Sequence, residues 1–160
     1  MTEASPAASP TSRLADLGII LPTAAPPAAN YVPAVIIGDM LHISGQIPFD
    51  EAGGLVRGRL GETMDVAAGT ATARRCGIGL LAQMQAALCD LGRVRRVVKL
   101  GVFVACTADF NDQPEVANGA SNLMVEVFGE AGRHARSAVG VLALPRGVAV
   151  EIDAIIAIQP

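Results

Sequence analysis

The chain has 160 residues, of which 51% are hydrophobic, 17% are charged and 3% are aromatic, and its formal net charge is −3. This length predicts one domain. The acidic net charge argues against a nucleic acid or an anionic membrane as a partner, because such partners bind to basic patches. We see neither a run of ~20 apolar residues that would cross a membrane nor a basic start followed by an apolar run, so we expect a cytoplasmic protein.

Residues 1–20 form an N-terminal tail that is rich in Pro, Ala and Ser near its start. The only element expected in it is a short helical turn, capped by Ser12 and ending at Gly18, because serine favours the first position of a helix and glycine the position after its end. Residues 21–160 form the single domain.

The first half of the domain predicts a hairpin followed by a long helix. Residues 31–37 and 40–44 have strand character on either side of a tight turn at Gly38-Asp39, and a third short strand is expected over 55–59. Apolar residues at helical spacing then predict a helix over 63–91.

The second half predicts a strand, a helix and two strands. Residues 97–105 form a run of valine and phenylalanine typical of a buried strand, and Asp112 begins a helix that reaches 127–129. Two strands follow, joined by the Leu-Pro-Arg-Gly connection at 144–147. This order indicates an α+β domain in which the helices cover one face of a mixed sheet.

The cysteines carry no metal-binding pattern. Cys76, Cys89 and Cys106 are odd in number, form no CxxC motif and have no histidine at ligand spacing. We expect small buried hydrophobic side chains in a reducing compartment and no metal site.

Two charged residues interrupt the last two strands. Because strand side chains alternate, Arg136 shares a face with Ala138 and Gly140, while Glu151 points away from its apolar neighbours. If the two strands are antiparallel neighbours, Arg136 and Glu151 lie at about the same level of one face, beside space for an anion. The alternative is a structural ion pair of Arg136 with Glu151 or Asp153. No helix covers that face, so oligomerisation through it is expected.

Three separated motifs stand out. They are the C-terminal set Ala135-Arg136-Ser137, Leu144-Pro145 and Val150-Glu151-Ile152, the N-terminal run Ile43-Ser44-Gly45-Gln46-Ile47-Pro48, and Tyr31-Val32 before the first strand. Together they resemble the signatures of the Rid family, the reactive intermediate deaminases that are also called YjgF-like or endoribonuclease L-PSP. The resemblance spans about residues 21–158. The run Asn118-Gly-Ala-Ser121 is similar to a subgroup with poorly defined substrates.

This resemblance implies a chorismate-mutase-like fold, assembled as a homotrimer with a small-molecule cleft between each pair of subunits. The implied activity is the hydrolysis of 2-imino or 2-enamino acids, such as 2-aminoacrylate, to 2-keto acids and ammonia, with no cofactor or metal. Arg136 would hold the substrate carboxylate, since a guanidinium grips a carboxylate through two parallel hydrogen bonds. Glu151 would position or activate water.

Other positions of the implied cleft follow from the same motifs. Tyr31, Ser44 and Gly45 would line it, and the asparagine that the family carries on its second helix matches either Asn118 or Asn122. Ala138 stands where well-known members often have cysteine, so chemistry on such a cysteine is absent here.

Two other functions fit the same fold. One is a non-catalytic protein that binds a keto acid or regulates a partner, and the other is an endoribonuclease or translation inhibitor. The acidic net charge, the single tyrosine and the lack of a basic stripe count against RNA as the ligand.

Overall fold

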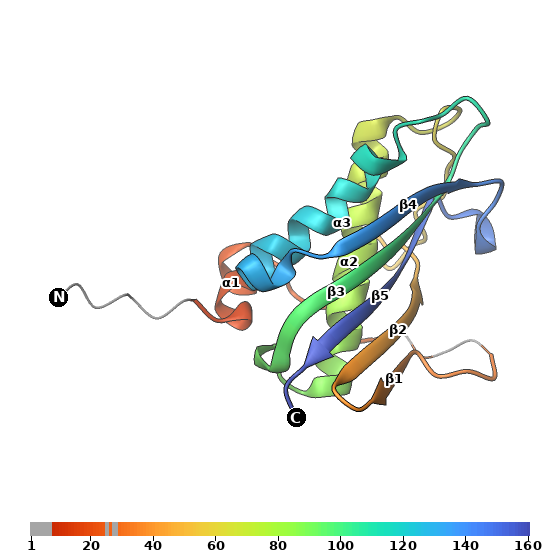
Figure 1. The fold of residues 1–160 in the computed structure, drawn as a ribbon. Helices are drawn as coiled ribbons and strands as arrows, with labels where there is room; N and C mark the ends of the chain where they lie inside the picture. Colours follow the sequence, from red (N-terminus) through yellow and green to blue (C-terminus); the bar gives the residue numbers. More distant parts are fainter. Residues whose placement is uncertain (1–7, 25, 27–28) are drawn as a thin grey trace.

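The computed structural model describes residues 8–24, 26 and 29–160. Two long helices lie against one face of a five-stranded sheet (Figure 1). In chain order the helices and strands are α1 (Pro10–Asp16), β1 (Ala34–Ile37), β2 (Met40–Gln46), α2 (Val66–Leu88), β3 (Val94–Ala105), α3 (Gln113–Phe128), β4 (Ala135–Val141) and β5 (Val150–Ile158). Three short 3₁₀ turns, η1 (Leu91–Arg93), η2 (Gly129–Gly132) and η3 (Pro145–Gly147), join them.

The strands have the order β1-β2-β5-β3-β4. β3 and β4 are parallel, and every other pair is antiparallel. The sheet is therefore mixed, with α2 and α3 on one side, as the order of elements predicted. One adjacency differs from the prediction, because β3 lies between β4 and β5 and separates the two C-terminal strands.

Alternation along the central strand β5 divides the sheet into two faces. Val150, Ile152 and Ile156 are fully buried beneath the helices, whereas Glu151 and Asp153 point to the opposite face. We call that opposite side the open face, because no helix of the described residues packs on it (Figure 1).

The helices approach each other closely at small residues. A Cβ on Gly119 of α3 would overlap the backbone carbonyl of Thr70 in α2, and a Cβ on Gly77 would press on Leu123. Glycine in the middle of a helix costs up to about 1 kcal/mol, and this close contact explains why it is found there.

The N-terminal helix begins earlier than predicted. Ser9, not Ser12, is the cap: its hydroxyl accepts a hydrogen bond from the Ser12 amide at 3.1 Å, and Pro10 occupies the first helical position that proline favours. Leu14 is buried in the core, so this short helix packs on the domain. Residues 1–7 of the predicted tail lie outside the described residues.

The predicted strand over 55–59 is wrong. Leu55 and Arg57 form only isolated bridges, to Phe49 and Val148. Gly58 has φ +153, which is a backbone conformation that disrupts a regular ladder. The segment is a loop that crosses the end of the sheet. The first strand is also shorter than predicted and starts at Ala34.

The open face exposes large apolar side chains. Ile37 is 69% exposed, Val139 46% and Val35 43%. They lie on the two edge strands, β1 and β4, and large apolar side chains exposed on a sheet face are typical of a protein interface. Within the described part of the chain, no helix has both the length and the apolar character that a bilayer span requires.

The cysteine prediction holds at two positions and fails at the third. Cys76 and Cys106 are buried, but Cys89 is exposed, because α2 ends at Leu88 and the chain turns there with a left-handed φ of 62° at Cys89.

Candidate functional site

Four of the residues predicted from the motifs line one cavity of about 440 Å³. They are Tyr31, Ser44, Gly45 and Glu151, which come from the segment before β1, from β2 and from β5. The rest of the lining is Pro26, Pro33, Gln46, Ile47, Phe49, Gln83, Pro145 and Arg146.

An irregularity in β2 shapes this cavity. The pairing of β2 with β5 shifts register between Ile43 and Gln46, so Ser44 and Gly45 leave the regular ladder. The Ser44 hydroxyl donates to the Pro33 carbonyl at 3.1 Å, which ties the strand to the segment before β1. The bound hydroxyl makes Ser44 a wall of the cavity.

Gly45 leaves room for the carboxylate of Glu151. A Cβ at this position would overlap the Glu151 carboxylate, with its Cδ only 2.8 Å away. The acid therefore lies directly against the backbone of β2, and only glycine permits that approach.

Glu151 is held in an environment that favours its neutral form. Burial raises the pKa of its carboxyl group, and the like charge of Asp153 on the same face raises it further. Within the described residues, no ion pair or hydrogen bond to its carboxylate opposes this shift. A carboxyl group of this kind can exchange protons closer to neutral pH than an ordinary glutamate.

Two glutamines in the wall of the cavity are hydrogen-bonded to each other. Gln46 Nε2 donates to the Ser44 carbonyl at 3.0 Å, and Gln83 Nε2 on α2 donates to Gln46 Oε1 at 3.4 Å. Gln83 is only 3% exposed. Gln46 belongs to the N-terminal motif but was given no role, and Gln83 was not predicted at all. A glutamine on the apolar side of a helix is a detectable signal, because a buried amide needs hydrogen-bond partners.

Arg146 is a further residue of the cavity that was not predicted as part of the site. It lies in η3 between β4 and β5 with φ 60°, and its carbonyl accepts a hydrogen bond from Arg57 Nε at 2.9 Å. It is exposed and contributes a cation to the lining.

Arg136 is not part of this cavity, and the predicted juxtaposition with Glu151 within one chain is wrong. Arg136 pairs with Leu100, which pairs with Ala154, whereas Glu151 pairs with Phe103. Arg136 thus lies three residues along the sheet from Glu151 and on the helix-covered face. The error arises because an intervening strand changes the register.

The guanidinium of Arg136 is held by α3. Its Nη1 donates to Asn118 Oδ1 at 2.9 Å and to Ser121 Oγ at 3.1 Å. Among the described residues no hydrogen bond reaches its Nε or Nη2, and no ion pair joins it to Glu151 or Asp153. Of the two candidate asparagines, the structure brings Asn118 to the arginine.

Asp153 has a different position from Glu151. It lies on the open face above Gly101 of β3, whose missing side chain leaves space for the carboxylate. Asp153 does not line the 440 Å³ cavity, and its effect on Glu151 is electrostatic.

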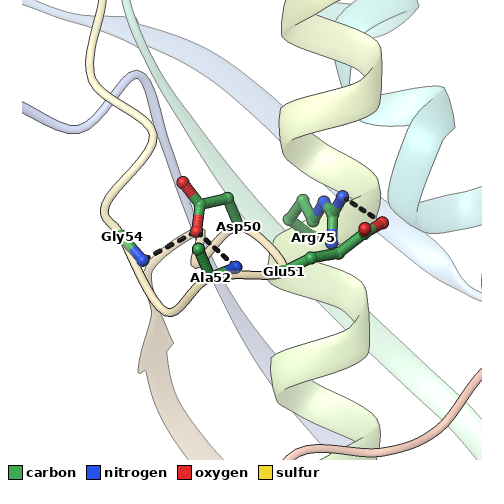
Figure 2. A network of polar contacts seen from close by, with 5 residues as sticks. All are labelled: Asp50, Glu51, Ala52, Gly54 and Arg75. Carbon is green, nitrogen blue, oxygen red and sulfur yellow. Dashed lines mark hydrogen bonds and ion pairs between the residues drawn. The ribbon is translucent and has the colours of Figure 1, made fainter.

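A neighbouring cavity of about 430 Å³ lies against α2. Figure 2 shows part of its rim, where Arg75 Nη2 lies 3.1 Å from Glu51 Oε1 and Asp50 Oδ1 accepts from the amides of Ala52 and Gly54. Gln46 and Ile47 line both cavities, but none of the residues predicted to bind substrate or act in catalysis lines this one. No group of three or more His, Cys, Asp or Glu side chains within residues 8–24, 26 and 29–160 is arranged to hold a metal ion.

Known proteins match the chain along most of its length. Residues 11–150 match the family described as "YjgF/chorismate mutase-like, putative endoribonuclease". Protein TCP17 of Trypanosoma cruzi is 55% identical over 91% of each chain. A crystal structure of a protein of unknown function from Agrobacterium tumefaciens is 48% identical over 92% of each chain, with a TM-score of 0.85. The 2-iminobutanoate/2-iminopropanoate deaminase of Dermatophagoides farinae is 29% identical over 88% of this chain and 95% of its own.

Proposed function

The chain belongs to the YjgF/chorismate-mutase-like (Rid) family, and from that premise we propose that it hydrolyses small 2-imino and 2-enamino acids to 2-keto acids and ammonia in a homotrimer. The observation that carries the proposal is the pair of half-sites. A carboxyl group with a raised pKa lies in a cavity, and a guanidinium with a free edge lies elsewhere on the same chain.

The two half-sites support a cleft between subunits. Arg136 lies on β4, an edge strand, while Glu151 lies in the cavity at the other side of the sheet. One chain cannot apply both to a small molecule, because they lie on opposite faces. The exposed apolar side chains of the open face support association of copies, and a closed ring of three would bring β4 of one copy to the cavity of the next.

The reaction needs an anion grip and a proton carrier. Arg136 of one copy binds the substrate carboxylate through two hydrogen bonds. Glu151 of its neighbour takes a proton from water as the oxygen bonds to the imine carbon, and the C=N π electrons move to nitrogen. Glu151 then returns that proton to nitrogen, which gives a carbinolamine. It next takes the proton of the new hydroxyl group and passes it to the amino nitrogen, so that the C–N bond breaks and ammonia leaves as the carbonyl forms. One imine and one water give one keto acid and one ammonia.

The deaminase from Dermatophagoides farinae supports this substrate class, since its name states 2-imino acids as substrates and the two chains share nearly their whole length. The names of TCP17 and of the Agrobacterium protein state no substrate.

The first experiment measures the decay of 2-iminopropanoate made in situ by an amino-acid oxidase. The wild-type chain should accelerate its loss, and Arg136→Ala should lower kcat/KM by about 100-fold, because two charge-assisted hydrogen bonds at about 1.5 kcal/mol each are lost. No acceleration together with pyruvate binding would indicate a non-catalytic keto-acid binding protein. RNA cleavage that survives Arg136→Ala would indicate a nuclease instead.

The second experiment tests the shared cleft. Arg136→Ala and Glu151→Gln chains are inactive separately, but equal amounts that are unfolded and reassembled together should recover about a quarter of the wild-type activity. A quarter is expected because each cleft draws its arginine and its glutamate independently from the two kinds of chain. Absence of recovery in mixed trimers would show that each site is built by one chain.

A further inference from the structure

A chain of hydrogen bonds runs from Arg136 to the backbone at the end of η2, just before β4. Arg136 Nη1 lies 3.1 Å from Ser121 Oγ, Ser121 Oγ lies 2.9 Å from His134 Nε2, and His134 Nδ1 lies 2.6 Å from the Gly132 carbonyl oxygen. We call this the Ser121–His134 relay. It links the guanidinium to α3 and to the end of η2.

The two ends of the relay fix its outer hydrogen bonds. The Gly132 carbonyl only accepts, so His134 Nδ1 carries a hydrogen, and a guanidinium only donates, so Ser121 Oγ accepts from Arg136. The serine hydroxyl hydrogen is then free to donate to His134 Nε2 when that nitrogen carries no proton. In this arrangement His134 is neutral, with its hydrogen on Nδ1.

Electrostatics favour the same neutral form. Burial lowers the pKa of His134, and the positive charge of Arg136 lowers it further, against the hydrogen bond to Gly132, which raises it. The other charges nearby are remote or paired: Arg133 binds Glu130 at 3.0 Å, and Lys99 of β3 is in register with Ala135, on the opposite face. The side chains of α3 in contact with Arg136 and His134, Asn118 and Ser121, are uncharged.

The relay holds one edge of the guanidinium and leaves the other open. Both hydrogen bonds to α3 use Nη1, while Nε and Nη2 have no hydrogen bond within the described residues. Nε and Nη2 form the edge through which arginine binds a carboxylate with two parallel hydrogen bonds. A guanidinium whose rotation is fixed in advance loses less entropy when it binds that carboxylate.

We propose that Ser121 and His134 are positioning residues, which fix the rotation of the Arg136 guanidinium so that its Nε–Nη2 edge faces the substrate carboxylate. This inference rests on the proposed function, because it assumes that Arg136 binds the carboxylate. Neither residue touches the reacting atoms, and their effect on the reaction passes through the arginine.

The first test examines the tautomer of His134 without any turnover. The chain contains two histidines, and His42 is exposed, so a proton–nitrogen correlation spectrum of the full chain needs only the His42→Gln variant for assignment. At pH 7 the His134 signal should be that of a neutral ring with its hydrogen on Nδ1. A charged ring, or a ring with its hydrogen on Nε2, overturns the relay.

The second test separates positioning from chemistry. Ser121→Ala should raise both the Kd for pyruvate and the KM for 2-iminopropanoate about 10-fold, with kcat changed less than 2-fold, since the lost interaction acts equally on ground state and transition state. Ser121→Thr, which keeps the hydroxyl, should restore both constants to within about 2-fold of wild type. Ser12→Ala, at an exposed serine of α1, is the matched control and should change neither.

The outcomes distinguish this inference from the proposed function. If the wild-type chain shows no turnover but Ser121→Ala still weakens pyruvate binding, the positioning role stands and the deaminase proposal fails. If the wild-type chain turns over and Ser121→Ala leaves Kd and KM unchanged, the positioning role fails and the deaminase proposal stands. A Ser121→Thr variant as weak as Ser121→Ala would also overturn the inference.

Discussion

The cavity beside β2 and the edge strand β4 treat their charged residues in opposite ways. In the cavity, Glu151 is brought against the backbone of Gly45 and beside the like charge of Asp153, and its carboxylate has no hydrogen bond or ion pair within the described residues. At the edge, Arg136 is held by the neutral side chains Asn118 and Ser121. The cavity therefore disfavours the ionised form of Glu151, whereas the edge strand fixes the orientation of the charged Arg136 side chain.

This difference shows why each region is incomplete by itself. An acid with a raised pKa can move protons but cannot hold an anion, and an oriented guanidinium can hold an anion but cannot move protons. The raised pKa of Glu151 also means that its ionised form destabilises the folded chain relative to an ordinary surface glutamate. The three predictions below test whether the regions have these separate roles.

The largest expected effect is on proton transfer. Glu151→Gln should lower kcat about 100-fold, because the amide cannot accept a proton from water, while the Kd for pyruvate should change less than 3-fold. Steady-state kinetics with 2-iminopropanoate and a pyruvate titration measure the two quantities.

Asp153→Asn is the matched control for Glu151→Gln. It should keep kcat within about 3-fold, because Asp153 acts on Glu151 only through its charge. Glu151 must be ionised to accept a proton, so activity rises with pH through its pKa. Removing the neighbouring charge lowers that pKa and moves the rising limb of the pH–rate profile to lower pH. Equal losses of kcat in both variants would contradict the distinct role of Glu151.

A smaller loss of kcat is expected when a larger residue at position 45 crowds the Glu151 carboxylate. Gly45→Ala should lower kcat about 10-fold, because the new methyl group displaces the Glu151 carboxylate from its position over β2. Its free energy of unfolding should change by only about 1 kcal/mol, since the end of a flexible side chain can move.

Gly79→Ala supplies the comparison for Gly45→Ala. Its Cβ would meet Gln46 at an ordinary contact distance of 3.4 Å, and the glycine lies inside α2, so the variant should keep its activity and gain up to about 1 kcal/mol of stability. If both variants lose activity equally, the contact between Gly45 and Glu151 has no special importance.

The smallest effect is on the pH dependence of stability, with opposite signs in the two regions. The lowered pKa of His134 means that the unfolded chain binds more protons just below the ordinary histidine pKa, so stability is lost as the pH falls through that range. The raised pKa of Glu151 means that the folded chain binds more protons just above the ordinary glutamate pKa, so stability is lost as the pH rises there.

Urea unfolding of the full chain over a pH series measures both slopes, at one fixed protein concentration because association contributes to stability. His134→Gln should flatten the loss on the acid side, and Glu151→Gln should flatten the loss above the glutamate range. Solvent screening keeps each change below about 1 kcal/mol. Parallel curves for wild type and variants would show that these groups are not perturbed.

Much of the architecture was predictable because it depends on local patterns. The apolar spacing over 63–91 predicted α2, whose bounds differ by three residues at each end, and the alternation around Glu151 correctly placed Val150 and Ile152 under the helices. The segment at 55–59 was predicted as a strand because its composition permits one. Whether a strand forms there depends on a partner strand, which no local pattern specifies.

The sequence predicted which residues belong to the site, but not how they are arranged in space. The motifs predicted Tyr31, Ser44, Gly45 and Glu151 as cavity residues, and these four line one cavity. Gln83 and His134 were not included, since their importance comes from contacts with Gln46 and Ser121, which lie 37 and 13 residues away in the chain.

The sequence alone determined the elements, the family and the residue types that could bind a small acid, because periodicity and motifs are local properties of the chain. Only the tertiary structure decided that β3 lies between the last two strands, which puts Arg136 and Glu151 on opposite faces of one sheet. The physical reason is that strand order depends on which long-range pairings bury the most apolar surface. Shifting the register by an odd number of residues reverses the face of every side chain.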